Sequence, residues 1–262
     1  MADYFLKQAK QYALARPNYP PELFRFIASK TPIRDLVWDV GTGSGQAAQS
    51  LAEIYKNVVA TDTSPKQLEF APKLPNIRYE HTSPVLSMLE FQEKVAPVPS
   101  SLDLITIAQA LHWFDLSEFY QLAKWALKKP DGVIAAWCYT VPEVDGAVDE
   151  VFGRFYAGSR PYWDPARKLV DDRYSTVDFP FEPVSGLDNT GPVRFVTERE
   201  MDIDDFFTYI RSWSSYQTAK EQGVEMLNEE VVEEFKAAWN ADGLVQKSIK
   251  YPVYLRIGRV GN

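Results

Sequence analysis

The chain has 262 residues, of which 45% are hydrophobic, so it is long and apolar enough to bury the core of one large domain. Its 36 acidic and 28 basic side chains give a net charge of -8, and no run of lysine and arginine breaks this balance. We therefore expect no nucleic-acid partner. Cys138 is the single cysteine, which excludes an internal disulfide and a zinc site of several cysteines, and we expect it to be a small buried residue.

The N-terminal residues and the apolar segments give no sign of export or of membrane insertion. Residues 1–7 lack the charged and then apolar layout of a signal peptide. No apolar run approaches the ~20 residues that a membrane-spanning helix requires. We therefore expect a cytoplasmic protein with no membrane partner.

Helix and strand signals alternate through the first half of the chain. Helical spacing of apolar side chains predicts helices over residues 4–15 and 21–29. The segments that follow are strands expected at 36–40, 57–61, 77–81, 102–108 and 133–137, and helices expected at 44–54, from Ser64-Pro65 onward and at 116–127. Strict alternation of this kind predicts an α/β fold with a doubly wound, mostly parallel sheet.

The alternation ends after Tyr139. Three further helices are expected at 145–156, 202–213 and 228–239, and a strand-rich segment at 245–260. Pro252 in that segment predicts an edge strand or a bulge. The expected organisation is a single domain with an N-terminal helical lid (1–34), a ligand-binding core (35–139), a cap over the cleft (140–220) and a return to the sheet (221–262).

The most informative segment is 36–46, which reads as an apolar strand, a glycine-rich turn and the start of a helix. Gly41 and Gly43 permit backbone conformations closed to other residues and let a ligand approach the main chain. The next strand ends at Asp62, whose carboxylate can accept both hydroxyls of a ribose. This arrangement predicts a nucleoside site at the carboxyl edge of the sheet.

The glycine spacing and Asp39 indicate which nucleoside ligand is bound. A dinucleotide fingerprint needs a third glycine where this chain has Gln46, and Gly45 falls one residue early. Asp39 places a negative charge directly before the turn, where it would repel a pyrophosphate but suit an ammonium group. S-adenosylmethionine has an ammonium group, a ribose and no phosphate, so we favour it over a nicotinamide cofactor. A glycine turn that binds no ligand is the remaining alternative.

Five segments carry a resemblance to a known family. They are Tyr12 to Pro20 with its Arg-Pro-x-Tyr-Pro motif, the glycine motif, and residues 108–115, 130–137 and 209–217. They resemble class I S-adenosylmethionine-dependent methyltransferases, and more narrowly the small-molecule group of trans-aconitate and plant embryo-abundant-protein-like methyltransferases. The resemblance covers nearly the whole chain. It implies a Rossmann-like sheet of seven strands with a C-terminal cap insertion.

The resemblance also implies a set of cofactor-binding residues. It places Asp39, Gly41 and Gly43 at the methionine moiety, and Arg16 at the carboxylate of the donor. The family usually carries an acidic residue after the third strand, where this chain has Ser83 and its neighbours. Adenine would then be bound by backbone groups or by Ser83. The complete set is Tyr12, Arg16, Asp39, Gly41, Thr42, Gly43, Asp62, Thr63, Ser83, Ala108 and Gln109.

A second set of residues is expected to serve the small-molecule methyl acceptor. His112 follows the fourth strand and is the candidate base or acceptor-orienting donor, although it could equally hold its loop. Arg160 could clamp an acidic acceptor or form a surface ion pair. Trp137, Tyr139, Trp213 and Tyr216 are expected to contact the acceptor or to belong to the core. No acidic cluster has the histidines or the spacing of a metal site, so no metal is expected.

The expected function is methyl transfer to oxygen of a small molecule, a carboxylate above all. A carboxylate with a pKa of about 4 is already a nucleophile at neutral pH and needs no base. O- or N-methylation of a hydroxyl or amine is the alternative enzymatic function, and it would need a base such as His112. A protein that keeps the fold without catalysis is the second alternative. The sequence does not indicate an oligomeric state.

Overall fold

The computed structural model describes residues 17–262 and divides them into two compact units. The sheet unit comprises residues 19–140, 169–195 and 253–262. The helical unit comprises residues 17–18, 141–168 and 196–252. The chain therefore passes between the units several times.

The strands form a seven-stranded sheet of order β3-β2-β1-β4-β5-β7-β6. Strands β1 to β5 pair in parallel, and β7 pairs antiparallel with β5. The strands are β1 (Leu36–Val40), β2 (Asn57–Asp62), β3 (Ile77–His81), β4 (Leu104–Ala108), β5 (Val133–Tyr139), β6 (Val193–Met201) and β7 (Lys247–Arg259). This architecture confirms the expected doubly wound, mostly parallel sheet of seven strands.

Three helices of the sheet unit, α4, α5 and α6, begin at side-chain caps that the sequence offers. Ser64, Ser87 and Asp115 each accept a hydrogen bond from the backbone N–H three residues later, which satisfies a donor of the first helical turn. The helices of this unit are α2 (Pro21–Lys30), α3 (Gln46–Ala52), α4 (Pro65–Glu69), α5 (Met88–Lys94) and α6 (Leu116–Ala126). Helix α8 (Arg167–Asp171) spans the division between the units.

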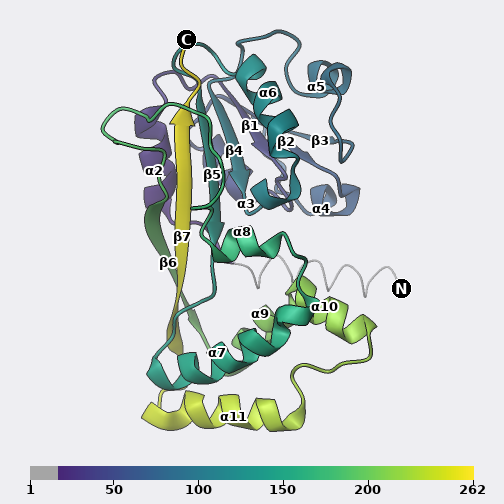
Figure 1. Cartoon of the computed structure of the whole chain (residues 1–262), viewed down its shortest axis with the longest axis vertical. Coiled ribbons are helices and arrows are strands. Elements are labelled where there is room, and N and C mark those ends of the chain that lie inside the picture. Colours follow the sequence, from purple (N-terminus) through teal and green to yellow (C-terminus); the bar gives the residue numbers. More distant parts are fainter. Residues whose placement is uncertain (1–16) are drawn as a thin grey trace. The chain divides into compact units, whose positions relative to one another are not determined.

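Helices cover both faces of the sheet (Figure 1). On β5, Trp137 packs edge-on against Phe24 of α2, with 5.9 Å between ring centroids. Ala136 and Cys138, which alternate with it, lie in a buried cluster with Phe119 of α6. Successive side chains of a strand point to opposite faces, so α2 and α6 enclose the sheet from its two sides. The sheet is therefore the middle layer of a three-layered core.

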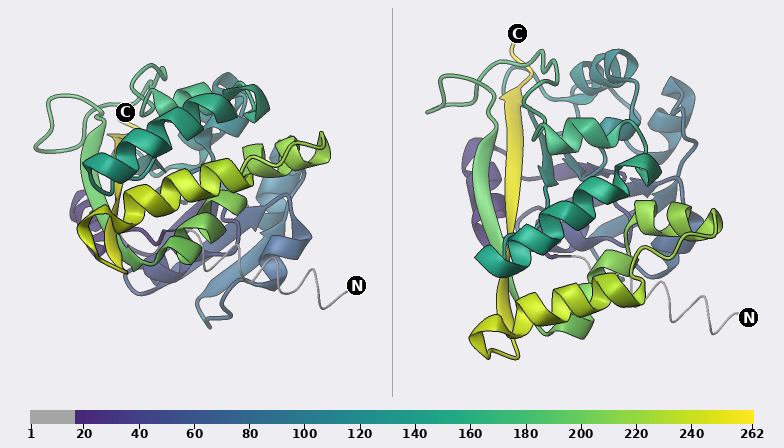
Figure 2. Two further views of the ribbon diagram at one scale, coloured as in Figure 1. Left: turned by 90° about the horizontal axis from the view of Figure 1, so that it is seen from below. Right: turned by 60° about the horizontal axis from the view of Figure 1, so that its bottom comes forward.

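The helical unit contains α7 (Gly146–Ser159), α9 (Ile203–Arg211), α10 (Ser214–Glu221) and α11 (Glu229–Trp239). Helices α7 and α11 run side by side (Figure 2), joined by Phe155 against Phe235 and by an ion pair of Arg154 with Glu234. The core of this unit is aromatic. Trp213 is only 2% exposed and is packed among the rings of Phe152, Phe155, Tyr156, Trp163 and Tyr209.

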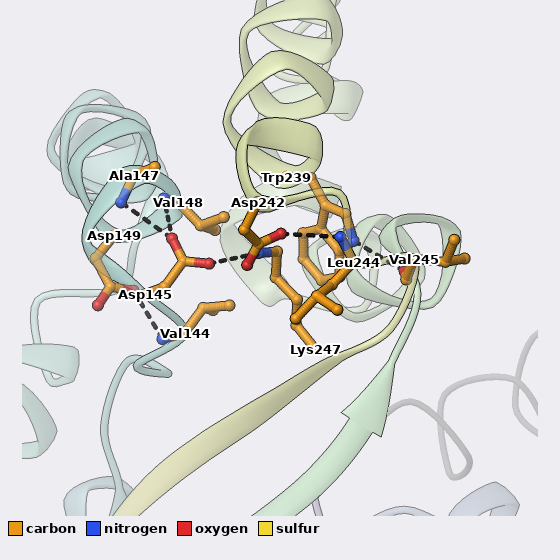
Figure 3. Close-up of polar contacts among 10 residues, drawn as sticks. All are labelled: Val144, Asp145, Ala147, Val148, Asp149, Trp239, Asp242, Leu244, Val245 and Lys247. Carbon is orange, nitrogen blue, oxygen red and sulfur yellow. Dashed lines mark hydrogen bonds and ion pairs between the residues drawn. The ribbon is translucent and has the colours of Figure 1, made fainter.

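One buried lysine joins three elements of the helical unit (Figure 3). Lys247 at the start of β7 is 5% exposed, and its Nζ lies 2.6 Å from a carboxylate oxygen of Asp145 and 2.6 Å from one of Asp242. Asp145 also caps α7, and Asp242 lies in the short 3-10 helix after α11. The cluster thus joins the start of β7 to the N-terminus of α7 and to the 3-10 helix that follows α11.

Several expected elements differ from those observed. The helix expected at 44–54 is limited to Gln46–Ala52, since Gly45 has a left-handed backbone conformation. Helix α5, helix α10 and strand β6 were not expected as separate elements. The edge-strand interpretation of Pro252 is wrong, because β7 lies between β5 and β6. Proline is tolerated there because pairing with β5 begins only at Val253, so Pro252 needs no N–H toward that strand.

Within residues 17–262, the structure contains no helix long and apolar enough to cross a membrane. The helix expected at 4–15 and most of the expected lid lie outside the described residues. The proposed cap over the cleft stays a prediction.

Candidate functional site

The turn that connects β1 to α3 has backbone conformations that favour glycine. Gly41, Gly43 and Gly45 have φ angles of +64°, +58° and +82°. A Cβ on Gly41 would lie 2.7 Å from Cβ of Ala110, and one on Gly45 would lie 2.6 Å from the hydroxyl of Tyr79. The main chain of the turn therefore packs directly against Ala110 and Tyr79, which a side chain at Gly41 or Gly45 would prevent.

Asp39 is a fully buried carboxylate directly before this turn. Its two oxygens accept hydrogen bonds from the hydroxyls of Thr42 and Thr106, both at 2.6 Å. Burial is the main cause that raises the pKa of Asp39 to about 6; the hydroxyls of Thr106 and Thr42 oppose this shift, and the nearby Asp62 adds a smaller rise. A buried carboxylate held by hydroxyls alone is stabilised by any cation placed beside it. Asp39 is thus suited to a ligand with a positive charge.

Asp62 ends β2 and holds the glycine turn in place. One of its carboxylate oxygens accepts from the backbone N–H of Gly43 and the other from that of Ser64, both at 2.8 Å. Each carboxylate oxygen has further acceptor capacity, so ribose hydroxyls can still bind. Thr42 N–H also donates to Thr61 O at 2.9 Å, and Thr63, expected beside adenine, is exposed.

Helix α5 brings an acidic residue, Glu90, to the end of β3, which the sequence analysis did not predict. The backbone N–H of Ser83 donates to Glu90 Oε1 at 3.0 Å, and Lys94 Nζ lies 2.9 Å from the same carboxylate. Lys94 lowers the pKa of Glu90, and the Ser83 amide lowers it further. Ser83 therefore uses its N–H inside the protein rather than for a ligand. The pattern Ser87-x-x-Glu90 is typical of a helix start and could have revealed α5.

Gln109 closes the end of β4 by joining it to β5. Its side-chain amide donates to Tyr139 O at 3.1 Å and accepts from Tyr139 N–H at 3.0 Å. Its own N–H donates to Trp137 O, and its φ angle is +58°. The side chain thus extends the pairing of the two strands, while Ala108 is left half-buried opposite Trp137. Contact of Ala108 and Gln109 with the donor stays a prediction.

Trp137 and Tyr139 are buried beside Tyr19. The rings of Tyr19 and Trp137 meet edge to face at 5.4 Å between centroids. The indole Nε1–H of Trp137 has no hydrogen-bond partner among the described residues. A buried donor without an acceptor costs about 1–3 kcal/mol, so a polar group brought to this position would be stabilised.

His112 lies in a short 3-10 helix, Leu111–Trp113, immediately after β4. Its Nδ1 is 2.9 Å from the hydroxyl of Tyr174, and the ring is half-buried. Ala110, two residues earlier, is the residue that packs against Gly41. The structure therefore brings His112 to the same sheet edge as the glycine turn. Tyr174 had no signal in the sequence, since it lies in an irregular segment.

The remaining acceptor candidates lie in the helical unit. Arg160 is exposed in the 3-10 helix after α7, and Trp213 belongs to the aromatic core described above. Tyr216 is 5% exposed, and its hydroxyl lies 2.5 Å from Glu225 Oε1. Burial and this carboxylate raise the pKa of Tyr216 to about 12. These contacts give Trp213 and Tyr216 structural roles, and contact of any of the three with an acceptor stays a prediction.

Other predicted residues can be placed briefly. Tyr12 and Arg16 lie outside the described residues. Cys138 is buried, as expected, with its Sγ 3.9 Å from Val170 O. Over residues 17–262, no three His, Cys, Asp or Glu side chains are grouped so as to hold a metal ion.

The residues present fit a nucleoside that carries a cation. Asp39 is a buried carboxylate directly before the glycine turn, and Asp62 ends the adjacent strand and holds the turn through the N–H of Gly43. A site of this kind can bind an ammonium group and a ribose at the carboxyl edge of the sheet.

Comparison with known proteins points to one kind of enzyme. Residues 38–136 match the family model described as "Methyltransferase domain". A Dictyostelium discoideum protein named as a methyltransferase is 32% identical, over 98% of this chain and 95% of its own length. A Saccharomyces cerevisiae protein named as an S-adenosylmethionine-dependent methyltransferase is 25% identical, over 80% of this chain and 79% of its own. A solved structure from Anaeromyxobacter dehalogenans, described as a type II methyltransferase, has a TM-score of 0.78 and 31% identity, and the match covers 94% of this chain and 98% of that one.

Proposed function

Because the chain belongs to the class I S-adenosylmethionine-dependent methyltransferases, we propose that it methylates a carboxylate oxygen of a small molecule. The observation that supports the donor part of the proposal is the pair of carboxylates at the glycine turn, Asp39 directly before it and Asp62 at the end of the adjacent strand. The pair provides one acidic group for an ammonium and one for a ribose. Such a ligand is the methyl donor of the family.

The donor would be held by groups of the sheet unit. Asp39 would attract the ammonium group, Asp62 would accept from the ribose hydroxyls, and the glycine turn would let the ligand approach the main chain. When bound, S-adenosylmethionine supplies the electrophilic methyl group. The protein has then only to orient the acceptor in line with the breaking bond and to exclude water.

Two features favour a carboxylate acceptor. First, an ionised carboxylate attacks without prior loss of a proton, so the reaction requires no base. Second, the Arg-Pro-x-Tyr-Pro motif and residues 108–115 resemble the trans-aconitate and embryo-abundant-protein-like group, and the proposal extends that resemblance to the acceptor. Arg160 would bind a second acidic group of the acceptor.

Methylation of a hydroxyl or an amine is the second candidate function. It is favoured by the position of His112 after β4, where an imidazole could remove a proton from the acceptor. Its rate would fall as the pH is lowered through the pKa of that base. With the donor at saturation, a carboxylate enzyme would keep its rate over the same interval.

The first test is calorimetric titration of the full chain with S-adenosylmethionine, S-adenosylhomocysteine and, as a control, NADH. Micromolar binding of the first two alone supports the donor site, and it would be followed by a screen of carboxylic acids, phenols and amines for methyl transfer. Transfer to phenols or amines only would overturn the carboxylate proposal. A cytoplasmic location stays a prediction from the sequence.

Asp62→Ala tests the ribose contact. We expect donor affinity to fall by about 1–3 kcal/mol, because ribose hydroxyls lose their acceptor and Gly43 loses its anchor. Asp35→Ala is the matched control, since Asp35 pairs with Lys56 at the opposite end of the same strand pair. Equal donor affinity in the two variants would contradict the proposed ribose site.

A further inference from the structure

We propose that Tyr174 holds His112 in the tautomer protonated on Nε2, so that His112 orients the acceptor as a hydrogen-bond donor and does not act as a base. The pairing of the two side chains is a feature of the structure. Its meaning for catalysis depends on the proposed carboxyl methylation. The inference makes Tyr174 a positioning residue that no segment of the sequence indicated.

The contact is a direct one between two aromatic side chains of the sheet unit. The Tyr174 hydroxyl lies 2.9 Å from His112 Nδ1, and the two ring centroids are 6.2 Å apart. Tyr174 is 0% exposed and belongs to the buried cluster between the sheet and α6. A hydrogen bond in such an apolar environment is strongly directional and is little weakened by water.

The backbone fixes the Tyr174 hydroxyl in this place. Arg173 and Tyr174 both have left-handed conformations, with φ angles of +61° and +54°, which non-glycine residues adopt only when their surroundings enforce them. The N–H of Tyr174 donates to Leu169 O at 2.8 Å, and its carbonyl accepts from Arg256 Nη1 at 2.8 Å.

Arg256 is itself firmly held. It is 7% exposed on β7, and its guanidinium also donates to Val177 O at 3.1 Å and to the Thr190 hydroxyl at 2.8 Å. A single buried side chain thus joins three points of the segment that carries Tyr174. Because that segment cannot shift without breaking these bonds, the hydroxyl is presented to His112 in one position.

The chemistry of the two groups decides the direction of the hydrogen bond. A phenol is a better donor than the N–H of a neutral imidazole, and the unprotonated imidazole nitrogen is a better acceptor than a phenol oxygen. Tyr174 therefore donates to Nδ1, and the proton of the neutral ring resides on Nε2. A histidine in this state offers an N–H and has no lone pair on Nε2 with which to remove a proton.

An N–H donor suits a carboxylate acceptor. It can bind one carboxylate oxygen and leave the other to attack. That oxygen forms the new O–CH₃ bond while the S–CH₃ bond of the donor breaks, and the electron pair of the broken bond stays on sulfur. The products are a neutral ester and a thioether, and no proton is taken up or released.

The tautomer can be read directly, because the chain contains only two histidines, His81 and His112. The experiment records the ring nitrogen shifts of the full chain labelled with ¹⁵N-histidine at pH 8, with His81→Gln for assignment. We expect His112 to show a protonated Nε2 and an unprotonated Nδ1. A protonated Nδ1 in the wild-type protein would overturn the inference without any variant.

Tyr174→Phe then tests the cause. We expect its His112 shifts to move toward those of a mixture of tautomers, and kcat/KM for the acceptor to fall about 5-fold, the size expected for one hydrogen bond. Tyr120→Phe is the matched control, since it removes another buried hydroxyl from the same cluster and that hydroxyl has no partner among the described residues. The control should change neither readout.

The outcomes separate the inference from the function. Unchanged His112 shifts in Tyr174→Phe would refute the positioning role of Tyr174 and leave carboxyl methylation intact. The expected tautomer together with methylation of phenols alone would refute the proposed acceptor class, and with it the orienting role, but not the pairing.

Discussion

Replacing Asp39 by asparagine should make the protein more stable and at the same time poorer at binding the donor. Burial raises the pKa of Asp39 from 3.8 to about 6. Near neutral pH the unfolded chain carries an ionised carboxylate at no cost, while the folded protein must bury that charge. Asparagine keeps the shape and carries no charge.

The magnitude follows from the shift. A difference of about 2 pKa units corresponds to about 3 kcal/mol at 1.36 kcal/mol per unit. Between pH 4 and pH 6 the folded state keeps a proton that the unfolded state has lost, so wild-type stability decreases as pH rises through this interval. Asparagine has one acceptor oxygen for the hydroxyls of Thr42 and Thr106, which lowers the gain by about 1 kcal/mol. We therefore expect Asp39→Asn to be about 2 kcal/mol more stable at pH 8.

The assay is urea unfolding of the ligand-free protein from pH 4 to pH 8. Asp39→Asn should be about 1 kcal/mol less stable than wild type near pH 4, where only the lost acceptor counts, and about 2 kcal/mol more stable from about pH 6.5 upward. Asp103→Asn is the control, because Asp103 is also buried but pairs with Lys128 and accepts from two backbone amides, so this change should destabilise. Lower stability of Asp39→Asn at pH 8 would mean that the threonine hydrogen bonds outweigh the cost of burial.

The same variant tests the donor. We expect its affinity for S-adenosylmethionine at pH 8 to fall by about 1.5–3 kcal/mol, the contribution of a hydrogen bond to a charged group. The wild-type affinity should likewise weaken below about pH 6, as Asp39 takes up a proton. An Asp39→Asn protein that binds the donor as tightly as wild type would show that Asp39 does not bind the ammonium group.

Two further predictions concern the local structure. Lys247→Met should destabilise the chain by about 2 kcal/mol in urea unfolding, because Asp145 and Asp242 lose their buried cation. The control Lys236→Met, at an exposed ion pair, should change stability little. Similar values for both variants would mean that the Lys247 cluster does not stabilise the fold. Gly45→Ala should destabilise the chain by about 1–3 kcal/mol and weaken donor binding, since its Cβ would lie 2.6 Å from the Tyr79 hydroxyl. Adding Tyr79→Phe should restore part of the lost stability. A Gly45→Ala variant as stable as wild type would contradict the close packing of the turn.

The sequence determined the order of the elements and the position of the glycine turn. Apolar strands such as 36–40 and 133–137 alternate with helices whose caps, such as Ser64 and Asp115, are local signals. The positions of Gly41 and Gly43 in the turn and of Asp62 at the next strand end are also readable, because strand ends and turn residues follow from short-range backbone preferences. These features sufficed to predict the sheet and the family.

The tertiary structure alone decided which side chains meet. Glu90 reaches Ser83, Gln109 binds Tyr139, and Tyr174 contacts His112 across 62 positions of the chain. Such contacts depend on the tertiary path of segments that are far apart in the sequence, and hydrophobic periodicity does not predict that path. Burial also raises the pKa of Asp39 to about 6, because the cost of a charge is set by the water that the whole fold excludes.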